Sequence, residues 1–177
     1  MRRRIAALQA ERNAGYPMKL LIPATLTLAA LLGGCAPKAR YVRNTRIADT
    51  SENREILTVC EEYRRAVERL DVAKLVVLAS PRYHEDGGTL SAEDDYGNDG
   101  LRQVLATRFQ TAKQVRYGIE YRRLTRVGSR ATVDIYIDAS FLFAGARGDT
   151  WHPVTNYNRL ELEYDSKRQR WLFLAGM

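Results

Sequence analysis

Apolar and polar side chains alternate along residues 131–141 of this chain, and Phe143 keeps the same register. One set of positions is apolar: Ala131, Val133, Ile135, Ile137, Ala139, Phe141 and Phe143. The other set is mainly polar: Thr132, Asp134, Tyr136, Asp138 and Ser140. Successive side chains of a strand point to opposite faces of its sheet, so the pattern predicts a strand with one packed face. Other apolar elements must cover that face.

The same period of two recurs in the sequence before and after this strand. An earlier strand is expected at Val115, Tyr117, Ile119 and Tyr121, ahead of a turn at Gly128-Ser129. Two later strands are expected over residues 154–164 and 171–175, with a loop at 144–149 and a polar turn at 165–170. Consecutive strands joined by short connections pair in an antiparallel manner, which predicts a meander.

Three segments upstream of residue 115 instead repeat their apolar residues every three or four positions, which indicates amphipathic helices. The first starts near Asp49 and carries Ile56, Cys60, Tyr63, Val67 and Leu70. The second is short, with Asp71 as its cap and Ser80-Pro81 as its stop. The third is capped by Asn98 or Asp99, at the end of a loop over residues 81–100. Helices followed by antiparallel strands predict an α+β domain, with three N-terminal helices packed on the sheet.

This order of elements resembles the nuclear transport factor 2-like superfamily, of the SnoaL and ketosteroid isomerase type. The resemblance covers residues 49–177 and includes the short helix ending in Ser80-Pro81-Arg82-Tyr83 and the final strand Trp171-Leu172-Phe173. It implies a curved, cone-shaped antiparallel sheet and dimerisation through that sheet. The superfamily contains dehydratases, isomerases and cyclases as well as binding modules, so the fold does not settle the function. None of the enzymes' motifs can be placed here residue by residue.

The segment before Ala36 has the order of an export signal: Lys19, an apolar run over residues 20–32, then Gly33-Gly34 and Cys35. The tetrad that ends at Cys35 resembles the lipobox of bacterial lipoproteins, which implies lipidation of Cys35. As a helix residues 20–34 would span about 22 Å, less than the roughly 30 Å of a bilayer core, so this stretch is too short for an anchor. Ala36 after the cysteine is compatible with delivery to the outer membrane, on its periplasmic face.

These features divide the chain into a signal peptide at 1–34, a flexible tether at 35–48 and a domain at 49–177. The stretch before Met18 is unusually long for a signal, so translation is expected to begin at Met18; a long but genuine leader is the alternative. From Cys35 onward the chain keeps 23 basic and 20 acidic residues, a net charge of +3. That modest charge argues against nucleic-acid binding. With Cys35 lipidated, Cys60 has no disulfide partner in the chain and is expected to be a buried, inert thiol.

Two groups of residues are candidates for a base. His84 follows the second helix in Tyr83-His84-Glu85-Asp86, where a carboxylate could tune it, although an exposed loop histidine explains the same residues. Asp138 and Tyr136 share one face of the strand at 131–143. They could act as base and hydrogen-bond donor inside the cone, but the apolar opposite face favours an outward position for both.

Asn156 and Asn158 share a strand face with Leu160 and Leu162, so they are the better candidates for polar groups in a mainly apolar pocket. His152, beside Trp151 and Pro153, is a weaker candidate. Carboxylates are frequent in residues 84–99, but their spacing misses the standard calcium loop. We therefore expect no metal site and no cofactor.

Together these observations predict a lipid-anchored binding or scaffolding module in the bacterial envelope. Its expected partners are the membrane, through the N-terminal lipid, and an envelope protein or a small apolar ligand, with a homodimer as a further possibility. The alternative is a small lyase or isomerase of the dehydratase and cyclase type that uses a His or Asp base in the cone. An enzyme needs an open cone with a base inside, whereas a carrier needs the cone alone.

Overall fold

The computed structural model describes residues 40–86, 95–146 and 148–177, all within a compact unit that spans Lys38–Met177. Cys35 and the predicted signal peptide lie outside the described residues, as do Glu93 and Asp94 of the acidic stretch.

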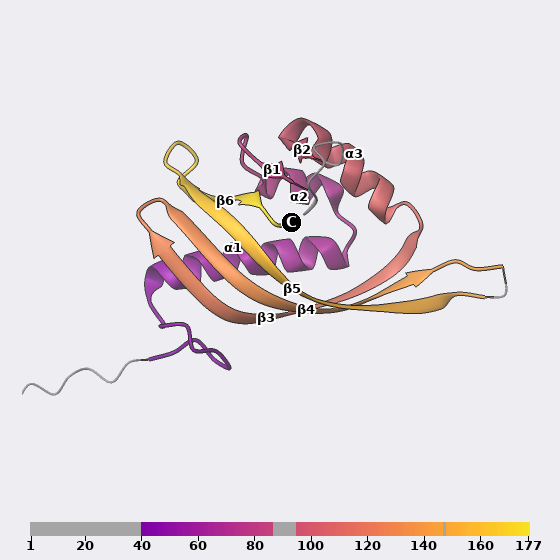
Figure 1. Cartoon of the computed structure of the whole chain (residues 1–177), viewed down its shortest axis with the longest axis horizontal. Helices are drawn as coiled ribbons and strands as arrows, with labels where there is room; N and C mark the ends of the chain where they lie inside the picture. The colour runs from indigo at the N-terminus through magenta and orange to yellow at the C-terminus, as the bar shows by residue number, and fades with distance from the viewer. Residues whose placement is uncertain (1–39, 87–94, 147) are drawn as a thin grey trace, which may run out of the picture. The chain divides into compact units, whose positions relative to one another are not determined.

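Three helices and a four-stranded antiparallel sheet make up most of this unit (Figure 1). The helices are α1 (Ser51–Glu68), α2 (Val72–Leu78) and α3 (Asn98–Phe109). The sheet has the order β3 (Ala112–Val127), β4 (Arg130–Phe143), β5 (Thr150–Asp165) and β6 (Arg170–Ala175). The meander and the α+β class are therefore confirmed.

The helix starts are set by polar side chains close to the predicted positions. Thr50, one residue after Asp49, caps α1 by accepting a hydrogen bond from the Asn53 amide at 3.2 Å. Asp71 caps α2 as predicted, accepting from the Lys74 amide at 2.9 Å. The start of α3 differs, because its capping residue is Gly97 and no side chain bonds to its first turn. The side chain of Asn98 instead donates to the Ser80 carbonyl at 2.9 Å, which fixes α3 to the end of α2.

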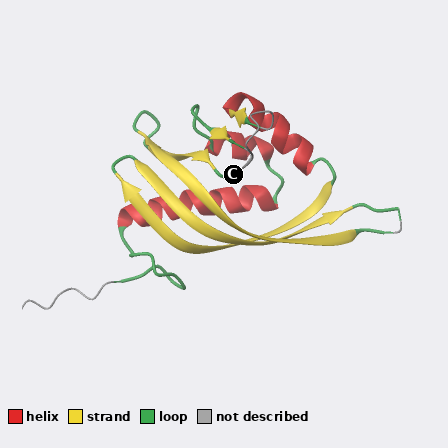
Figure 2. Ribbon diagram, in the orientation of Figure 1, coloured by secondary structure: helices red, strands yellow, loops and turns green. Residues whose placement is uncertain are grey.

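The core lies between α1 and one face of the sheet, which curves along that helix (Figure 2). Ile56 and Cys60 of α1 are fully buried, as are Val133 of β4 and Leu160 of β5. Each fully buried aliphatic side chain contributes roughly 1.5–3 kcal/mol. Burial raises the pKa of the Cys60 thiol far above its ordinary value. Cys60 is thus the buried, un-ionised thiol expected from the sequence.

Residues 40–48, which the sequence assigned to a tether, already pack on the domain. Tyr41 forms an isolated bridge with Ala48, and the Asp49 amide donates to the Arg40 carbonyl at 2.8 Å. The turn that results buries Ile47 to 4% exposure in the core. Packed structure therefore begins upstream of residue 49, in a basic segment where a single buried isoleucine gives no periodic signal.

The loop predicted over residues 81–100 contains two very short strands, β1 (His84–Glu85) and β2 (Tyr96–Gly97), which pair in an antiparallel manner. The tip between them lies outside the described residues. Two residues per strand are too few to show alternation, so the sequence could not predict this hairpin.

Candidate functional site

A cavity of about 360 Å³ lies between the helices and the α1-facing side of the sheet. Its floor is buried and mostly apolar, formed by Tyr63, Val67, Leu75, Leu105 and Tyr117. Three phenylalanines, Phe109, Phe141 and Phe143, form half-buried walls. The mouth is marked by exposed residues, among them Arg108, His152 and Val154. This gradient from apolar floor to polar mouth is typical of a small-molecule site.

Two tyrosine hydroxyls supply the polar group of the floor. The hydroxyl oxygens of Tyr63 and Tyr117 lie 3.1 Å apart and share one hydrogen bond. Burial raises the pKa of both side chains, which keeps both hydroxyls neutral. Only one of the two hydroxyl protons takes part in the hydrogen bond between the tyrosines. The other can be donated to an oxygen of a bound molecule.

The polar groups nearer the mouth are Arg108, His152 and Asn158. The Arg108 guanidinium lies 5.7 Å from the centre of the Tyr96 ring, and the His152 ring meets Phe143 edge to face at 5.3 Å. The side chain of Asn158 is already hydrogen-bonded within the protein. Its amide nitrogen donates to the Gly176 carbonyl at 2.8 Å, and its oxygen accepts from the Arg159 backbone amide. Arg108 and His152 therefore remain the groups best placed to meet a ligand.

Among the main sequence candidates, which are His84, Tyr136, Asp138, Asn156 and Asn158, only Asn158 lines this cavity. Asn156 lies on the same face of β5, opposite Ile137, but it is exposed and does not line the cavity. His84 is exposed on β1, with its ring 3.9 Å from the Asp95 carboxylate, and is not part of the cavity either. The sequence candidates therefore do not converge.

Tyr136 and Asp138 lie on the opposite face of β4 from the cavity. The strand alternates as predicted, with Ile135 and Ile137 buried toward the helices. The interior position considered for Asp138 is thus wrong, because the apolar residues take the covered face. The outward alternative holds for both residues.

His152 is the cavity residue that the sequence undervalued. It pairs with Phe141 across the β4–β5 ladder, which places it on the cavity side of β5 together with Val154 and Asn158. The sequence began this strand at residue 154, after Pro153, whereas β5 begins at Thr150 and includes the proline. Extending the alternation of Asn158, Asn156 and Val154 two residues upstream would have found it.

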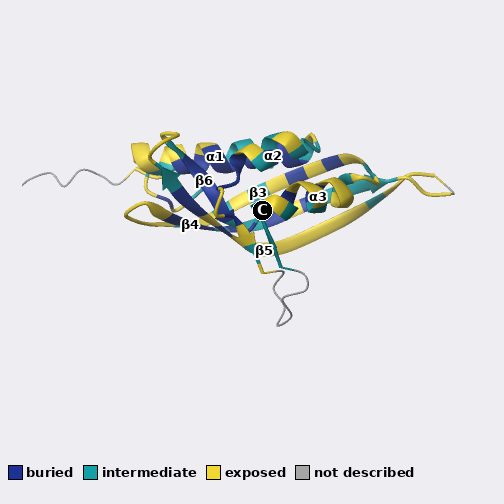
Figure 3. Ribbon diagram, turned by 90° about the horizontal axis from the view of Figure 1, so that it is seen from above, coloured by how far each residue is buried: buried dark blue, intermediate teal, exposed yellow. Residues whose placement is uncertain are grey.

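The outer face of the sheet carries aromatic rings and charges. Tyr136 and Tyr157 are in contact, with ring centres 5.0 Å apart, and the Arg122 guanidinium lies 5.6 Å from the Tyr136 ring. Tyr157 is 72% exposed. Figure 3 shows that β5 is exposed along much of its length. This face, between β3 and β5, is called the outer sheet face below.

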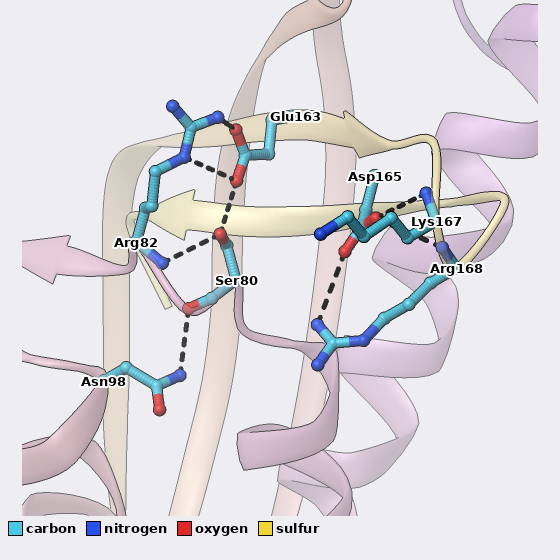
Figure 4. A network of polar contacts seen from close by, with 7 residues as sticks. All are labelled: Ser80, Arg82, Asn98, Glu163, Asp165, Lys167 and Arg168. Carbon is cyan, nitrogen blue, oxygen red and sulfur yellow. Dashed lines mark hydrogen bonds and ion pairs between the residues drawn. The ribbon is translucent and has the colours of Figure 1, made fainter.

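A second polar cluster surrounds Glu163 of β5 (Figure 4). The carboxylate is buried to 6% exposure and accepts hydrogen bonds from the Ser80 hydroxyl and the Arg82 guanidinium. Ser80 is fully buried, and its amide donates to the Phe173 carbonyl of β6 at 2.7 Å. The cluster therefore joins the segment after α2 to the sheet, and its polar groups bond to one another.

Among residues 40–86, 95–146 and 148–177 there is no group of three His, Cys, Asp or Glu side chains that could hold a metal ion. No helix in these ranges has the length and apolar character needed to cross a membrane.

Solved structures of low sequence identity share this fold. A ketosteroid isomerase-like protein from Erwinia carotovora atroseptica is 17% identical, with a TM-score of 0.59 over 72% of this chain and 94% of that chain. A candidate scytalone dehydratase from Novosphingobium aromaticivorans is 14% identical, with a TM-score of 0.57 over 71% and 80%. A conserved protein from Planctomyces limnophilus is 12% identical, with a TM-score of 0.59 over 71% and 92%. No family model and no curated protein matches the sequence.

Proposed function

We propose that this chain is a bacterial envelope lipoprotein whose domain binds a small, mainly apolar molecule in the cavity between the helices and the sheet. The observation that carries the proposal is the cavity itself, with its buried floor and exposed mouth. A domain of this fold that served only as a scaffold could fill the same space with side chains. The apolar floor favours hydrocarbon, and the Tyr63–Tyr117 pair offers one oxygen-binding point within it.

Blocking the mouth tests the binding proposal. Val154 is 45% exposed at the mouth, so Val154→Trp adds bulk there without crowding the core. The full-length chain should bind the small neutral fluorescent probe 1-naphthylamine, and Val154→Trp should weaken that binding about tenfold or more. The matched control is Val127→Trp, at an exposed strand position that is not part of the cavity. Equal binding by both variants and the parent chain would argue against this cavity as the site.

The lipoprotein part of the proposal rests on the sequence around Cys35. Two or more acyl chains on one cysteine would make membrane attachment stable, because each buried methylene contributes about 0.8 kcal/mol. Expressed in a bacterium with the lipoprotein pathway, the chain should partition into detergent and carry diacylglycerol on Cys35. Cys35→Ser should remain in the aqueous phase, and a parent chain that also stays aqueous would refute lipidation.

An envelope protein partner or a second copy of the chain would use the outer sheet face. Tyrosine, tryptophan and arginine are enriched at protein interfaces. This face presents Tyr157 and the Arg116 guanidinium, whose carbon lies 4.4 Å from the centre of the Trp151 ring. The residue types of this face and the exposure of Tyr157 support its use as an interface.

A small lyase or isomerase is the second candidate function. Two similar structures carry names of that enzyme type, a ketosteroid isomerase-like protein and a candidate scytalone dehydratase. The bases first considered, His84 and Asp138, do not line the cavity. His152 does, so His152→Gln would abolish turnover and spare binding if the chain were an enzyme. A carrier would show no turnover in either form.

A further inference from the structure

We propose that the ligand of this cavity is an anionic amphiphile, with its tail on the apolar floor and its acid group at Arg108; the inference rests on the proposed binding function. The argument starts from charge at the mouth. Arg108 and His152 line the cavity, and no Asp or Glu side chain is among its lining residues. A bound anion would therefore meet a cation at the mouth and no opposing acidic side chain on the walls.

Arg108 is available for such a contact. The described residues give it no ion pair with any carboxylate, and its guanidinium contacts the face of the Tyr96 ring at 5.7 Å. Several other arginines of the domain are already paired, for example Arg64 with Glu61 and Glu68. A guanidinium offers five N–H donors in a planar fork that matches a carboxylate or phosphate.

Arg108 also lies in the last turn of α3, where a cation is favourable for the helix dipole. That position explains a basic residue there, but it does not require the side chain to line the cavity. A dipole role changes stability and leaves ligand selectivity unaffected. Selectivity between ligands that differ only in head-group charge therefore separates the two roles.

The size of the cavity limits the ligand. At roughly 30 Å³ per non-hydrogen atom, 360 Å³ holds about a dozen such atoms. The tail is then a short alkyl chain or a ring system of similar volume. The Tyr63 and Tyr117 hydroxyls leave one hydrogen-bond donor on the floor. The cavity can therefore hold a tail that carries an oxygen as well as a plain hydrocarbon tail.

The test compares three probes that share one straight alkyl tail: octanoate, 1-octanol and octylammonium. Calorimetric titration of the full-length chain should give octanoate the tightest binding, about tenfold or more over 1-octanol, because a charge-assisted hydrogen bond adds to burial of the tail. Octylammonium should bind more weakly than 1-octanol. Arg108→Gln should remove most of the preference for octanoate and leave 1-octanol unchanged, and Arg108→Lys should restore part of it.

Arg102→Gln is the matched control, since Arg102 is exposed on the same helix but is not part of the cavity. It should leave all three affinities unchanged. Equal binding of octanoate and 1-octanol, or a preference that survives Arg108→Gln, would overturn the anion inference and leave the apolar binding function standing. Absence of binding by all three probes would overturn the binding function and this inference with it.

Discussion

Gly176 occupies a position that no other residue fits without moving the backbone. Its φ of +86° lies in the left-handed region, and an added Cβ would lie 2.0 Å from the Arg159 carbonyl oxygen. Its amide donates to the Glu85 carboxylate at 2.8 Å, and its carbonyl accepts from Asn158. This residue therefore connects the end of β6 with β1 and with β5 near the cavity.

Gly176→Ala should lower the free energy of unfolding by about 2–4 kcal/mol, because the left-handed conformation and the steric clash both add cost. Urea denaturation measures it. Gly128→Ala is the control, since Gly128 also has a positive φ, +57°, but has no atom within 4 Å of the added Cβ. That change should cost only about 1–2 kcal/mol. Equal losses for the two variants would mean that the contact with Arg159 carries no energy.

At this scale the sequence could predict which face of a strand a residue occupies, but it could not predict the cavity. The alternation along β4 placed Ile135 and Ile137 inward and made the outward position of Asp138 the favoured one. The cavity instead collects residues from three helices and three strands. No short motif records that assembly, so Arg108 was not a candidate before the structure, and His152 was only a weak one.

Among the elements, α1 is held to its neighbours by Glu62. Its carboxylate accepts from the Lys74 ammonium of α2 at 2.7 Å and from the Arg170 guanidinium of β6 at 3.4 Å. The Lys74 hydrogen bond, aided by the charge of Arg170, holds the pKa of Glu62 below its ordinary value. The contribution of Glu62 to the stability of the fold is therefore present in full above the pKa of about 4.3 that Glu62 has in the unfolded chain. It is lost as the pH falls through the lower pKa of the folded state.

Glu62→Gln should cost about 0.5–1 kcal/mol between pH 5 and 7, since both ion-pair partners are about one-third exposed. The difference from the parent chain should shrink as the pH falls below about 4. Urea denaturation across this range measures both values. Glu55→Gln is the control, because Glu55 is exposed on the same helix, and it should cost less than Glu62→Gln at pH 7. A loss from Glu62→Gln that grew toward acid would contradict the assigned ion pairs.

Glu163 gives a second test at the level of elements, because it joins the segment after α2 to β5. Glu163→Leu should cost about 1–3 kcal/mol, since it leaves the fully buried Ser80 hydroxyl without its acceptor. Arg82→Ala should cost less, about 1 kcal/mol or below, because Arg82 is 67% exposed and its interaction is screened by water. The same urea denaturation measures both. The reverse order would show that the ion pair, and not the buried hydrogen bond, holds the junction.

The elements themselves could be predicted almost completely from the sequence. The change of period predicted at Val115, close to the start of β3 at Ala112, separated helices from strands, and Asp71 and Pro81 marked the limits of α2. Two parts escaped prediction, the turn over residues 40–48 and the β1–β2 hairpin, since both are too short to show a period. Pro153 hid the start of β5, because proline lacks the N–H that a strand ladder uses.

For the molecule as a whole, the exposed outer sheet face is the surface that can pair with a second copy of the chain. A face that pairs with its own copy about a twofold axis must tolerate its own charges. Both signs occur there: Arg116, Arg122, Arg123 and Arg159 beside Glu120, Asp134, Asp138 and Glu161. Self-pairing is therefore not opposed by a single-sign field, and the exposed Tyr157 ring offers apolar contact.

The full-length chain should sediment as a dimer at micromolar concentration, and Tyr157→Glu should shift it toward the monomer by about tenfold or more in dissociation constant, since a buried charge without a partner is costly. Val77→Glu is the control, because Val77 is 60% exposed on α2 and away from the sheet. It should leave the dimer intact. A parent chain that stays monomeric at the highest soluble concentration would exclude self-pairing through this face.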